Sequence, residues 1–249
     1  MSTTITTAFL NQLKSFYPAS RLASGGTQNS SAISNPWYIV TAVALSASNK
    51  PDGVPRVFEH MLSQELKDPA SDSQENRLIL ARKFREAIFK SGLISGYPKA
   101  INSLVALHEA MPDDLRDTQI HRSTTMSLAE YEQKGQVFWD SVYGANDIYE
   151  MLYKVYPDLA WFSKTIGYGF TYGPMQDAFP GGLSQLETSY TLVAALIAGD
   201  TPQQIAWHLA GAKRCGASSE EVQAVRSIAI EVAKHCGIQW KNPVPEIDL

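Results

Sequence analysis

The chain has 249 residues, of which 44% are hydrophobic and 18% charged, and its formal net charge is −4. This apolar content can build one compact core or two small ones, which excludes disorder over most of the chain. The 21 Lys and Arg residues are balanced by 25 Asp and Glu residues without a basic run. No apolar stretch approaches the roughly 20 residues that span a bilayer. We therefore expect neither nucleic acid nor a membrane among the partners.

The first 34 residues are rich in Ser and Thr and carry only Lys14 and Arg21 as charged side chains. An acid-poor segment of this kind resembles an organellar transit sequence, although these two basic residues make a poor basic face. The last three residues, Ile247, Asp248 and Leu249, differ from the Ser-Lys-Leu peroxisomal signal. We therefore predict a solvated lead-in over 1–34 and a cytoplasmic location, with a mitochondrial or peroxisomal location as the alternative.

Apolar residues recur at helical spacing through residues 35–110, which we predict to be a first helical lobe. Asn35 and Pro36 form a typical helix start. With a short stripe before the lobe, the predicted helices cover residues 9–16, 36–47, 55–62, 80–92 and 98–108. Charged and polar residues then fill 111–126, which we predict to be a linker in which His121 is exposed to solvent.

A second lobe is predicted over residues 127–238, with a tail over 239–249. Three Ser/Thr-x-x-Glu/Gln capping boxes mark helix starts in it: Ser127–Glu130, Thr201–Gln204 and Ser218–Glu221. Helical stripes cover 128–142, 148–155, 186–197, 205–212 and 222–236. No segment shows sustained alternation with hairpin turns. We therefore predict an all-α fold of about nine or ten helices.

The two predicted lobes contain similar segments. Residues 38–48 form an apolar helix that is followed by a proline and then by His60, and residues 190–200 are followed in the same way by His208. Two diverged copies of one helical hairpin would explain this pattern. The two histidines would then occupy pseudo-symmetric positions. The alternative is a chance similarity between amphipathic helices.

None of the five histidines has the spacing of a metal-binding motif, so we predict no metal site. His208 lies beside the apolar stripe of its helix, where an imidazole can act as a general acid or base. The alternative is a structural histidine bonded to a backbone carbonyl. Glu187, on the preceding helix, is its predicted partner. For Glu187 the alternative is a carboxylate that complements the helix dipole.

Aromatic residues and glycines are concentrated between residues 161 and 182. Glycines permit close approach, and tyrosine hydroxyls offer polar groups inside an apolar cavity. Tyr168 and Tyr172 are therefore predicted to line a pocket for a small ring-shaped ligand, together with Trp207 beside His208. The alternative is a packed transition from helix to loop.

The segments 181–187, 193–197 and 208–222 together resemble the carboxymuconolactone decarboxylase family, within the alkyl hydroperoxidase D-like superfamily. The resemblance rests on a Leu-Ser…Glu helix, on His208 followed at four-residue steps by Ala212 and Gly216, and on the cap before Val222. Residues 85–104 add a Gly-x-Pro-x-Ala helix. The chain looks most like two-lobed fungal members of the family. The resemblance implies an alkyl hydroperoxidase D-like helical bundle and a homo-oligomer.

The peroxidase branch of that superfamily carries a Cys-x-x-Cys-x-x-x-His motif. At the two cysteine positions before His208 this chain has Thr201 and Gln204, while Cys215 lies beyond the histidine. A thiol peroxidase needs an attacking thiol beside a resolving one. The chain is therefore predicted not to be a thiol peroxidase.

The resemblance implies a cofactor-independent lyase or isomerase that acts like a decarboxylase on a small cyclic or polyketide-like organic acid. His208 would carry the proton and Glu187 would be its partner. Trp207, Tyr168, Tyr172 and His60 would bind substrate, and Arg214 would bind its carboxylate. The alternatives are a non-catalytic oligomeric scaffold and an organellar stress-related protein of the same superfamily without peroxidase activity.

Overall fold

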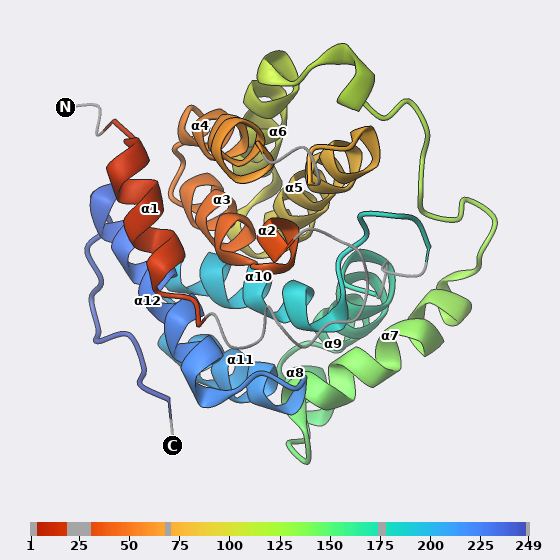
Figure 1. The fold of residues 1–249 in the computed structure, drawn as a ribbon. Helices are drawn as coiled ribbons and strands as arrows, with labels where there is room; N and C mark the ends of the chain where they lie inside the picture. The colour runs from red at the N-terminus through yellow and green to blue at the C-terminus, as the bar shows by residue number, and fades with distance from the viewer. Residues whose placement is uncertain (1–3, 19–30, 68–70, 174–177, 248–249) are drawn as a thin grey trace.

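The computed structural model describes residues 4–18, 31–67, 71–173 and 178–247. These residues form helices and no strand, which confirms the all-α prediction (Figure 1). The α-helices are α1 (Thr7–Ser15), α2 (Ser31–Ser34), α3 (Trp37–Ala47), α4 (Gly53–His60), α5 (Gln74–Ser95), α6 (Tyr97–Ala110), α7 (Leu128–Tyr143), α8 (Ile148–Val155), α9 (Pro157–Trp161), α10 (Gln185–Ala198), α11 (Pro202–Arg214) and α12 (Ser219–His235). Two π-helical segments, η2 (Met61–Glu65) and η4 (Phe162–Thr171), and one short 3₁₀ turn, η3 (Asp113–Leu115), complete the elements.

The described residues contain more helices than the sequence pattern predicts, because α2 and α9 are single turns too short to show an apolar stripe. Two of the three predicted capping boxes form, at Ser127 and Ser218. The third does not form, because Thr201 donates its hydroxyl to the carbonyl of Leu196 at 3.3 Å instead of capping α11. A box that we did not predict forms at Ser184, at the start of α10.

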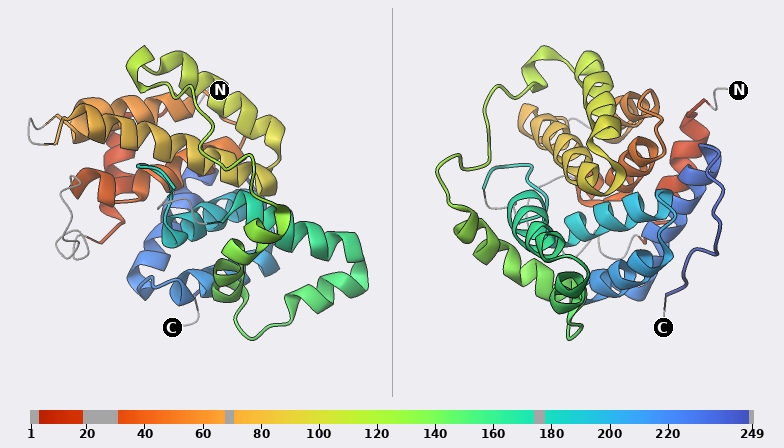
Figure 2. Two further views of the ribbon diagram at one scale, coloured as in Figure 1. Left: turned by 90° about the vertical axis from the view of Figure 1, so that its right-hand side faces the viewer. Right: turned by 180° about the vertical axis from the view of Figure 1, so that it is seen from behind.

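The main core surrounds α3 and α10. Every residue of α3 is buried, and so is every residue of α10 from Thr188 to Ala198. Helices enclosed in this way are apolar on all faces, which explains the continuous apolar runs of both segments. Figure 2 shows α10 between α3–α6 on one side and the helices of the second half on the other. The core joins residues of both predicted lobes and also contains Leu10, Leu13 and Tyr17, so the prediction of a solvated lead-in is wrong for the helix α1.

The packing around these two helices repeats. Helices α3 and α10 pack against each other, and each of them also packs against both α5 and α12. Each is followed by a turn in which the second residue after the helix has a left-handed backbone, Asn49 (φ 58°) and Asp200 (φ 55°). The units α3–α4–α5 and α10–α11–α12 are thus related in packing and in turn geometry, as expected for two diverged copies of one helical hairpin.

A smaller aromatic core lies beneath α7, α8 and η4. Helix α7 touches η4 backbone to backbone, because a side-chain carbon added at Gly135 would lie only 2.2 Å from the carbonyl oxygen of Tyr168. The first half of the predicted aromatic pocket segment is helical, since η4 extends to Thr171. Residues 174–177 of that segment lie outside the described residues. In the described part of the chain, no helix has both the length and the apolar character needed to cross a bilayer.

The predicted linker is bound to α5. Arg82 of α5 pairs with Asp117 at 2.9 Å, and Arg122 of the linker pairs with Glu86 of α5 at 2.6 Å. The expectation of a solvated His121 is wrong. Its ring stacks on Phe179 with 4.0 Å between centroids, and its Nε2 lies 3.1 Å from Asp117. Asp117 and Arg122 of the predicted linker are thus paired with side chains of α5, whereas Asp113 and Arg116 pair with each other.

Candidate active site

His208 lies on the buried face of α11 with 5% of its surface exposed. Its Nδ1 has no hydrogen-bond partner among the described residues. The ring of Tyr143 approaches it edge-on, with 6.0 Å between ring centroids. Burial lowers the pKa of His208 to about 4, because an apolar interior disfavours the charged imidazolium. At neutral pH this imidazole is therefore neutral.

Tyr143, the last residue of α7, joins the predicted pocket residues into one group. Its ring centroid lies 5.4 Å from that of Tyr168 and 6.3 Å from that of Trp207. Tyr168 in turn contacts Tyr172 edge-on at 5.3 Å. The structure therefore brings His208, Trp207, Tyr168 and Tyr172 together in one aromatic interior. We did not predict Tyr143. Its spacing of four residues from Trp139, which packs against it, is the only sequence signal for it.

One buried polar atom in this region, His208 Nδ1, lacks a hydrogen-bond partner within the described part of the chain. Each such atom costs about 1–3 kcal/mol when it stays unpaired. Native proteins keep few of them, and functional sites are a common reason for those that remain. Burial, then the neighbouring Tyr143, raises the pKa of Tyr168 well above its ordinary value, so this phenol stays protonated and can donate.

Cys215 borders the same interior. Burial raises the pKa of its thiol to about 11, even though hydrogen bonds from Ser189 and Ser141 and the charge of Arg214 favour the thiolate. A thiol with such a pKa is almost entirely protonated at neutral pH and is a poor nucleophile. The interior around His208 therefore offers neutral donors and acceptors and no reactive thiolate.

Glu187 has other partners. Its carboxylate accepts a hydrogen bond from the backbone N–H of Ser184 at 2.9 Å, which closes the capping box of α10. It also forms an ion pair with Lys83 of α5. No hydrogen bond or ion pair joins Glu187 to His208 among the described residues. The geometry matches the alternative interpretation, a carboxylate at the positive end of a helix.

The remaining predicted binding residues also have structural partners. His60, at the end of α4, is buried, lies 3.6 Å from Glu65 and meets the ring of Trp37 edge-on. Arg214 donates to the carbonyls of Ser141 (2.8 Å) and Val142 in the last turn of α7. Cations are favoured at that end of a helix. Arg214 therefore holds the last turn of α7. Its effect on the site is to fix the position of Tyr143.

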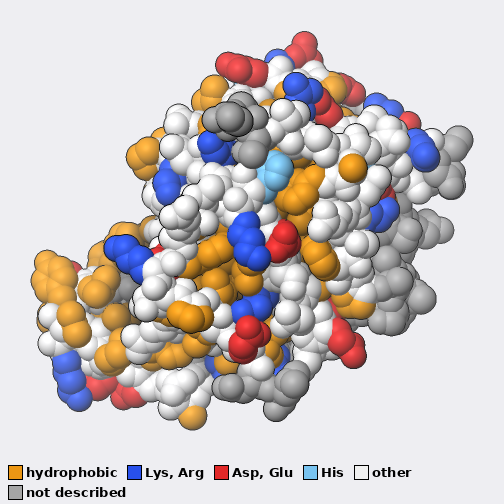
Figure 3. Space-filling model, turned by 90° about the vertical axis from the view of Figure 1, so that its left-hand side faces the viewer, with side chains coloured by type: hydrophobic (Ala, Val, Ile, Leu, Met, Phe, Trp, Pro, Cys, Tyr) orange, Lys and Arg blue, Asp and Glu red, His pale blue; other side chains and the backbone are white. Residues whose placement is uncertain are grey.

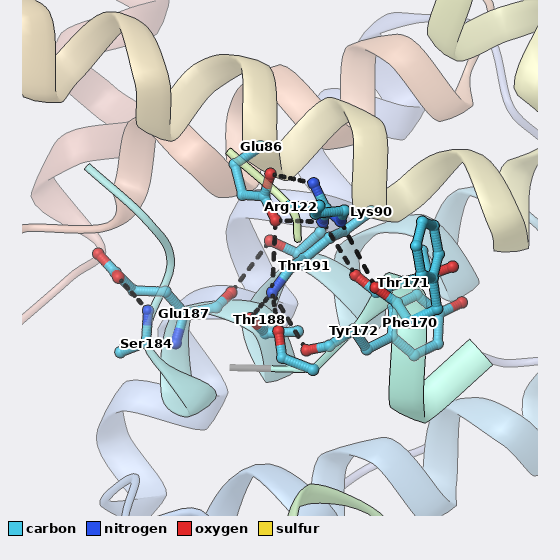
Figure 4. A network of polar contacts seen from close by, with 11 residues as sticks. Glu86, Lys90, Arg122, Phe170, Thr171, Tyr172, Ser184, Glu187, Thr188 and Thr191 are labelled. Carbon is cyan, nitrogen blue, oxygen red and sulfur yellow. Dashed lines mark hydrogen bonds and ion pairs between the residues drawn. The ribbon is translucent and has the colours of Figure 1, made fainter. Parts of the chain in front are cut away.

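A buried network of charges lies beside the site (Figure 4). Lys90 of α5 is fully buried and donates to Thr188 Oγ1 (2.9 Å) and to the carbonyls of Tyr172 (3.1 Å) and Gly173 (3.3 Å). Arg122 donates to the carbonyl of Thr171 at 3.2 Å. These carbonyls lie at the end of η4, where no helical N–H is available to them. The two cations supply the missing hydrogen-bond donors.

The charge balance of this network is uneven. Arg122 binds both oxygens of Glu86, at 2.6 and 3.1 Å, and Lys90 lies 3.7 Å from the same carboxylate. Burial lowers the pKa of Lys90 to about 8, and the charge of Glu86 opposes this shift. We did not predict this network, because no motif in the sequence distinguishes a buried lysine from an exposed one.

Groups of three or more His, Cys, Asp or Glu side chains that could hold a metal ion are absent from the described ranges. The donors of the His208 interior are one imidazole, phenols, a hydroxyl and a thiol. The chemistry open to them is proton transfer and hydrogen bonding to a small bound molecule.

Comparison with family models finds no match. Two curated proteins from yeasts are similar over most of their length, and both are called Peroxisomal protein 2. The protein from Schizosaccharomyces pombe is 31% identical over 209 residues, covering 83% of this chain and 90% of the relative. The protein from Saccharomyces cerevisiae is 29% identical over 269 residues, covering 86% of this chain and 93% of the relative. The chain therefore belongs to the Peroxisomal protein 2 family.

Proposed function

We propose that this protein is a cofactor-independent lyase or isomerase that removes a carboxylate from, or moves a proton within, a small cyclic or polyketide-like organic acid. The observation that carries the proposal is the unpartnered Nδ1 of His208 inside an aromatic interior that also contains the buried, protonated Tyr168 phenol. The resemblance of residues 181–222 to the carboxymuconolactone decarboxylase family supports the reaction class and an alkyl hydroperoxidase D-like bundle.

The proposed chemistry follows from the charges of the interior. Loss of CO2 from a bound carboxylate leaves a carbanion delocalised as an enolate, and a proton must then reach carbon. The neutral Tyr168 phenol donates a hydrogen bond to the enolate oxygen. An anionic substrate raises the pKa of the buried imidazole, because a nearby negative charge favours the imidazolium. His208 therefore takes up a proton as substrate binds, and delivers it to carbon.

Two features of the chain decide which residues and which chemistry the mechanism leaves out. Glu187 is bound by Ser184 and Lys83, so the proposed mechanism gives it no role as the partner of His208. The peroxidase chemistry of the superfamily is not proposed, because Thr201 and Gln204 stand at the cysteine positions and the Cys215 thiol has a raised pKa.

The His208→Asn variant is expected to lower kcat at least about 100-fold on a substrate found by screening wild-type protein against lactone carboxylates and β-keto acids. Removal of a positioned proton carrier typically costs 10²–10⁴-fold. Release of CO2 measures the reaction. The exposed His108 serves as the control, because His108→Asn should leave kcat unchanged. Unaltered turnover by His208→Asn on a genuine substrate would refute the assignment.

The second candidate is a non-catalytic oligomeric scaffold. The observation that favours it is a run of exposed hydrophobic side chains on α8, α9 and the start of η4: Met151, Tyr153, Val155, Tyr156, Leu159, Trp161 and Phe162. Hydrophobic side chains also gather among charged ones on the face drawn in Figure 3. Exposed apolar surface of this kind is typical of contacts between copies of a chain. A scaffold predicts no turnover by the wild-type protein on any compound of the panel.

We further propose a peroxisomal location, which the names of both yeast relatives support. The chain carrying a fluorescent protein at its N-terminus should colocalise with a peroxisomal matrix marker in yeast. A second fusion with the fluorescent protein at the C-terminus leaves the N-terminus free and tests the mitochondrial alternative, because a transit segment there would be needed for import. Colocalisation with a mitochondrial marker, or a diffuse cytoplasmic signal, would contradict the proposal.

A further inference from the structure

A cavity of about 790 Å³ lies beside α5, with Phe170 of η4 in its wall. Its walls come from α5, the segment 117–128 and the ends of α7 and η4 that carry Tyr131 and Phe170. None of the residues that surround His208 lines it. Its volume is within the range of roughly 300–1,000 Å³ that is usual for small-molecule sites. The cavity is therefore a separate feature of the molecule.

Most of the cavity wall is apolar. Tyr131 and Phe170 meet edge-on at 5.0 Å between ring centroids, and Arg122 packs flat against Phe89 at 4.2 Å. The remaining apolar lining residues are Leu104, Ile120, Met126, Leu128 and Phe179. A wall of rings and branched side chains buries the hydrophobic body of a ligand without requiring polar partners from it.

Three arginines line the cavity against two carboxylates, Glu86 and Asp117. Arg82 donates to Asp117 and to the carbonyl of Pro180, and Arg122 donates to Glu86 and to the end of η4. Their donors are thus satisfied within the protein. The two carboxylates leave one guanidinium uncompensated.

Arg85 is the arginine that remains. Its Nη2 donates to the carbonyl of Leu115, and its Nη1 lies 3.3 Å from Asp117. Its Nε is buried and has no hydrogen-bond partner in the described part of the chain. Burial lowers the pKa of this guanidinium; the charge of Asp117 opposes the shift, and that of Arg82 adds to it. An unpaired, desolvated guanidinium donor is a site for an anionic acceptor.

We propose that this cavity binds an amphipathic monocarboxylate, with its carboxylate near Arg85 and its aromatic or branched body against Phe89 and Phe170. The surplus positive charge favours a ligand with a carboxylate, and the apolar wall favours a ligand with a hydrophobic body. The proposal is independent of the reaction assigned to His208, because the two sites share no residue.

Isothermal titration calorimetry on the full chain tests the proposal with naphthoate and naphthalenemethanol, which share a ring system and differ in charge. Wild-type protein should bind naphthoate at one site, and the alcohol at least about tenfold more weakly. Arg85→Gln should weaken naphthoate binding at least about tenfold and leave binding of the alcohol unchanged. The exposed Arg56, which pairs with Glu59 at 3.2 Å, provides the matched control, and Arg56→Gln should change neither.

A second variant keeps the test valid if Arg85→Gln fails to fold. Ile120 lines the cavity, and 78% of its surface is exposed, so Ile120→Trp narrows the cavity without touching an ion pair. It should weaken both probes. His208→Asn should leave both bound. Equal binding of the two probes would overturn the selection of an anion. If wild-type protein binds neither probe, or if only His208→Asn loses binding, the proposal that this cavity is the binding site is wrong.

Discussion

The Glu86→Gln variant is expected to lose about 3–5 kcal/mol of unfolding free energy at neutral pH, the usual effect of breaking a buried ion pair from one side. Glu86 is 6% exposed and is the carboxylate that both Arg122 and Lys90 approach. Its removal leaves two cations beside the carbonyls of η4, with Glu187 as a remaining carboxylate whose charge acts on Lys90. Urea unfolding monitored by tryptophan fluorescence measures the loss.

The pH dependence of this loss follows from Lys90. The pKa of Lys90 is lowered to about 8, so the folded wild type holds a charged Lys90 below pH 8 and a neutral one above it. Glu86 stabilises only the charged form of Lys90. The difference in unfolding free energy between wild type and variant should therefore be larger at pH 6 than at pH 9.

Two further variants separate this explanation from a loss of packing. The exposed pair Arg56–Glu59 offers a matched control, because Glu59→Gln should cost less than about 0.5 kcal/mol. Adding Lys90→Met to Glu86→Gln should restore part of the stability, since it removes one of the unpaired cations. A double variant that is less stable than Glu86→Gln by the full cost of Lys90→Met would contradict the charge explanation.

Acid should destabilise the wild-type protein through His208. Its folded pKa is lowered to about 4, whereas an unfolded histidine titrates near 6.5. Between these values the unfolded chain binds a proton that the folded chain does not, so stability falls as the pH decreases from about 6.5 to about 4. The shift of roughly 2.5 units corresponds to about 3 kcal/mol.

The measurement compares wild type with His208→Phe, which keeps a ring beside Tyr143 and cannot titrate. Carboxylates also contribute to acid unfolding, but they do so in both proteins. The variant should therefore lack about 3 kcal/mol of the wild-type decrease in unfolding free energy between pH 6.5 and 4. The exposed His108 serves as the control, because His108→Gln should keep the wild-type slope. Parallel curves for wild type and His208→Phe would show that His208 is not held neutral by the fold.

Part of the site could be predicted from the chain alone. His208, Trp207, Tyr168 and Tyr172 are brought together as expected, because His208 and Tyr168 lie on the buried sides of their helices and Tyr172 directly follows η4. Tyr143 could not be chosen in this way, since its position depends on how α7 packs against α11. The pairing of Glu187 with His208 failed to form for a local reason. The capping box with Ser184 holds the carboxylate at the start of α10.

The sequence by itself determined the helical class and the helix starts at Ser127 and Ser218, because these depend on hydrophobic period and on hydrogen bonds within a few residues. Only the tertiary structure decided which charges are buried. Lys90, Glu86 and Arg122 have the composition of an ordinary solvated surface, and they meet because the linker closes over α5 beside the end of η4. Burial and charge balance are sums over long-range contacts, and no local pattern contains them.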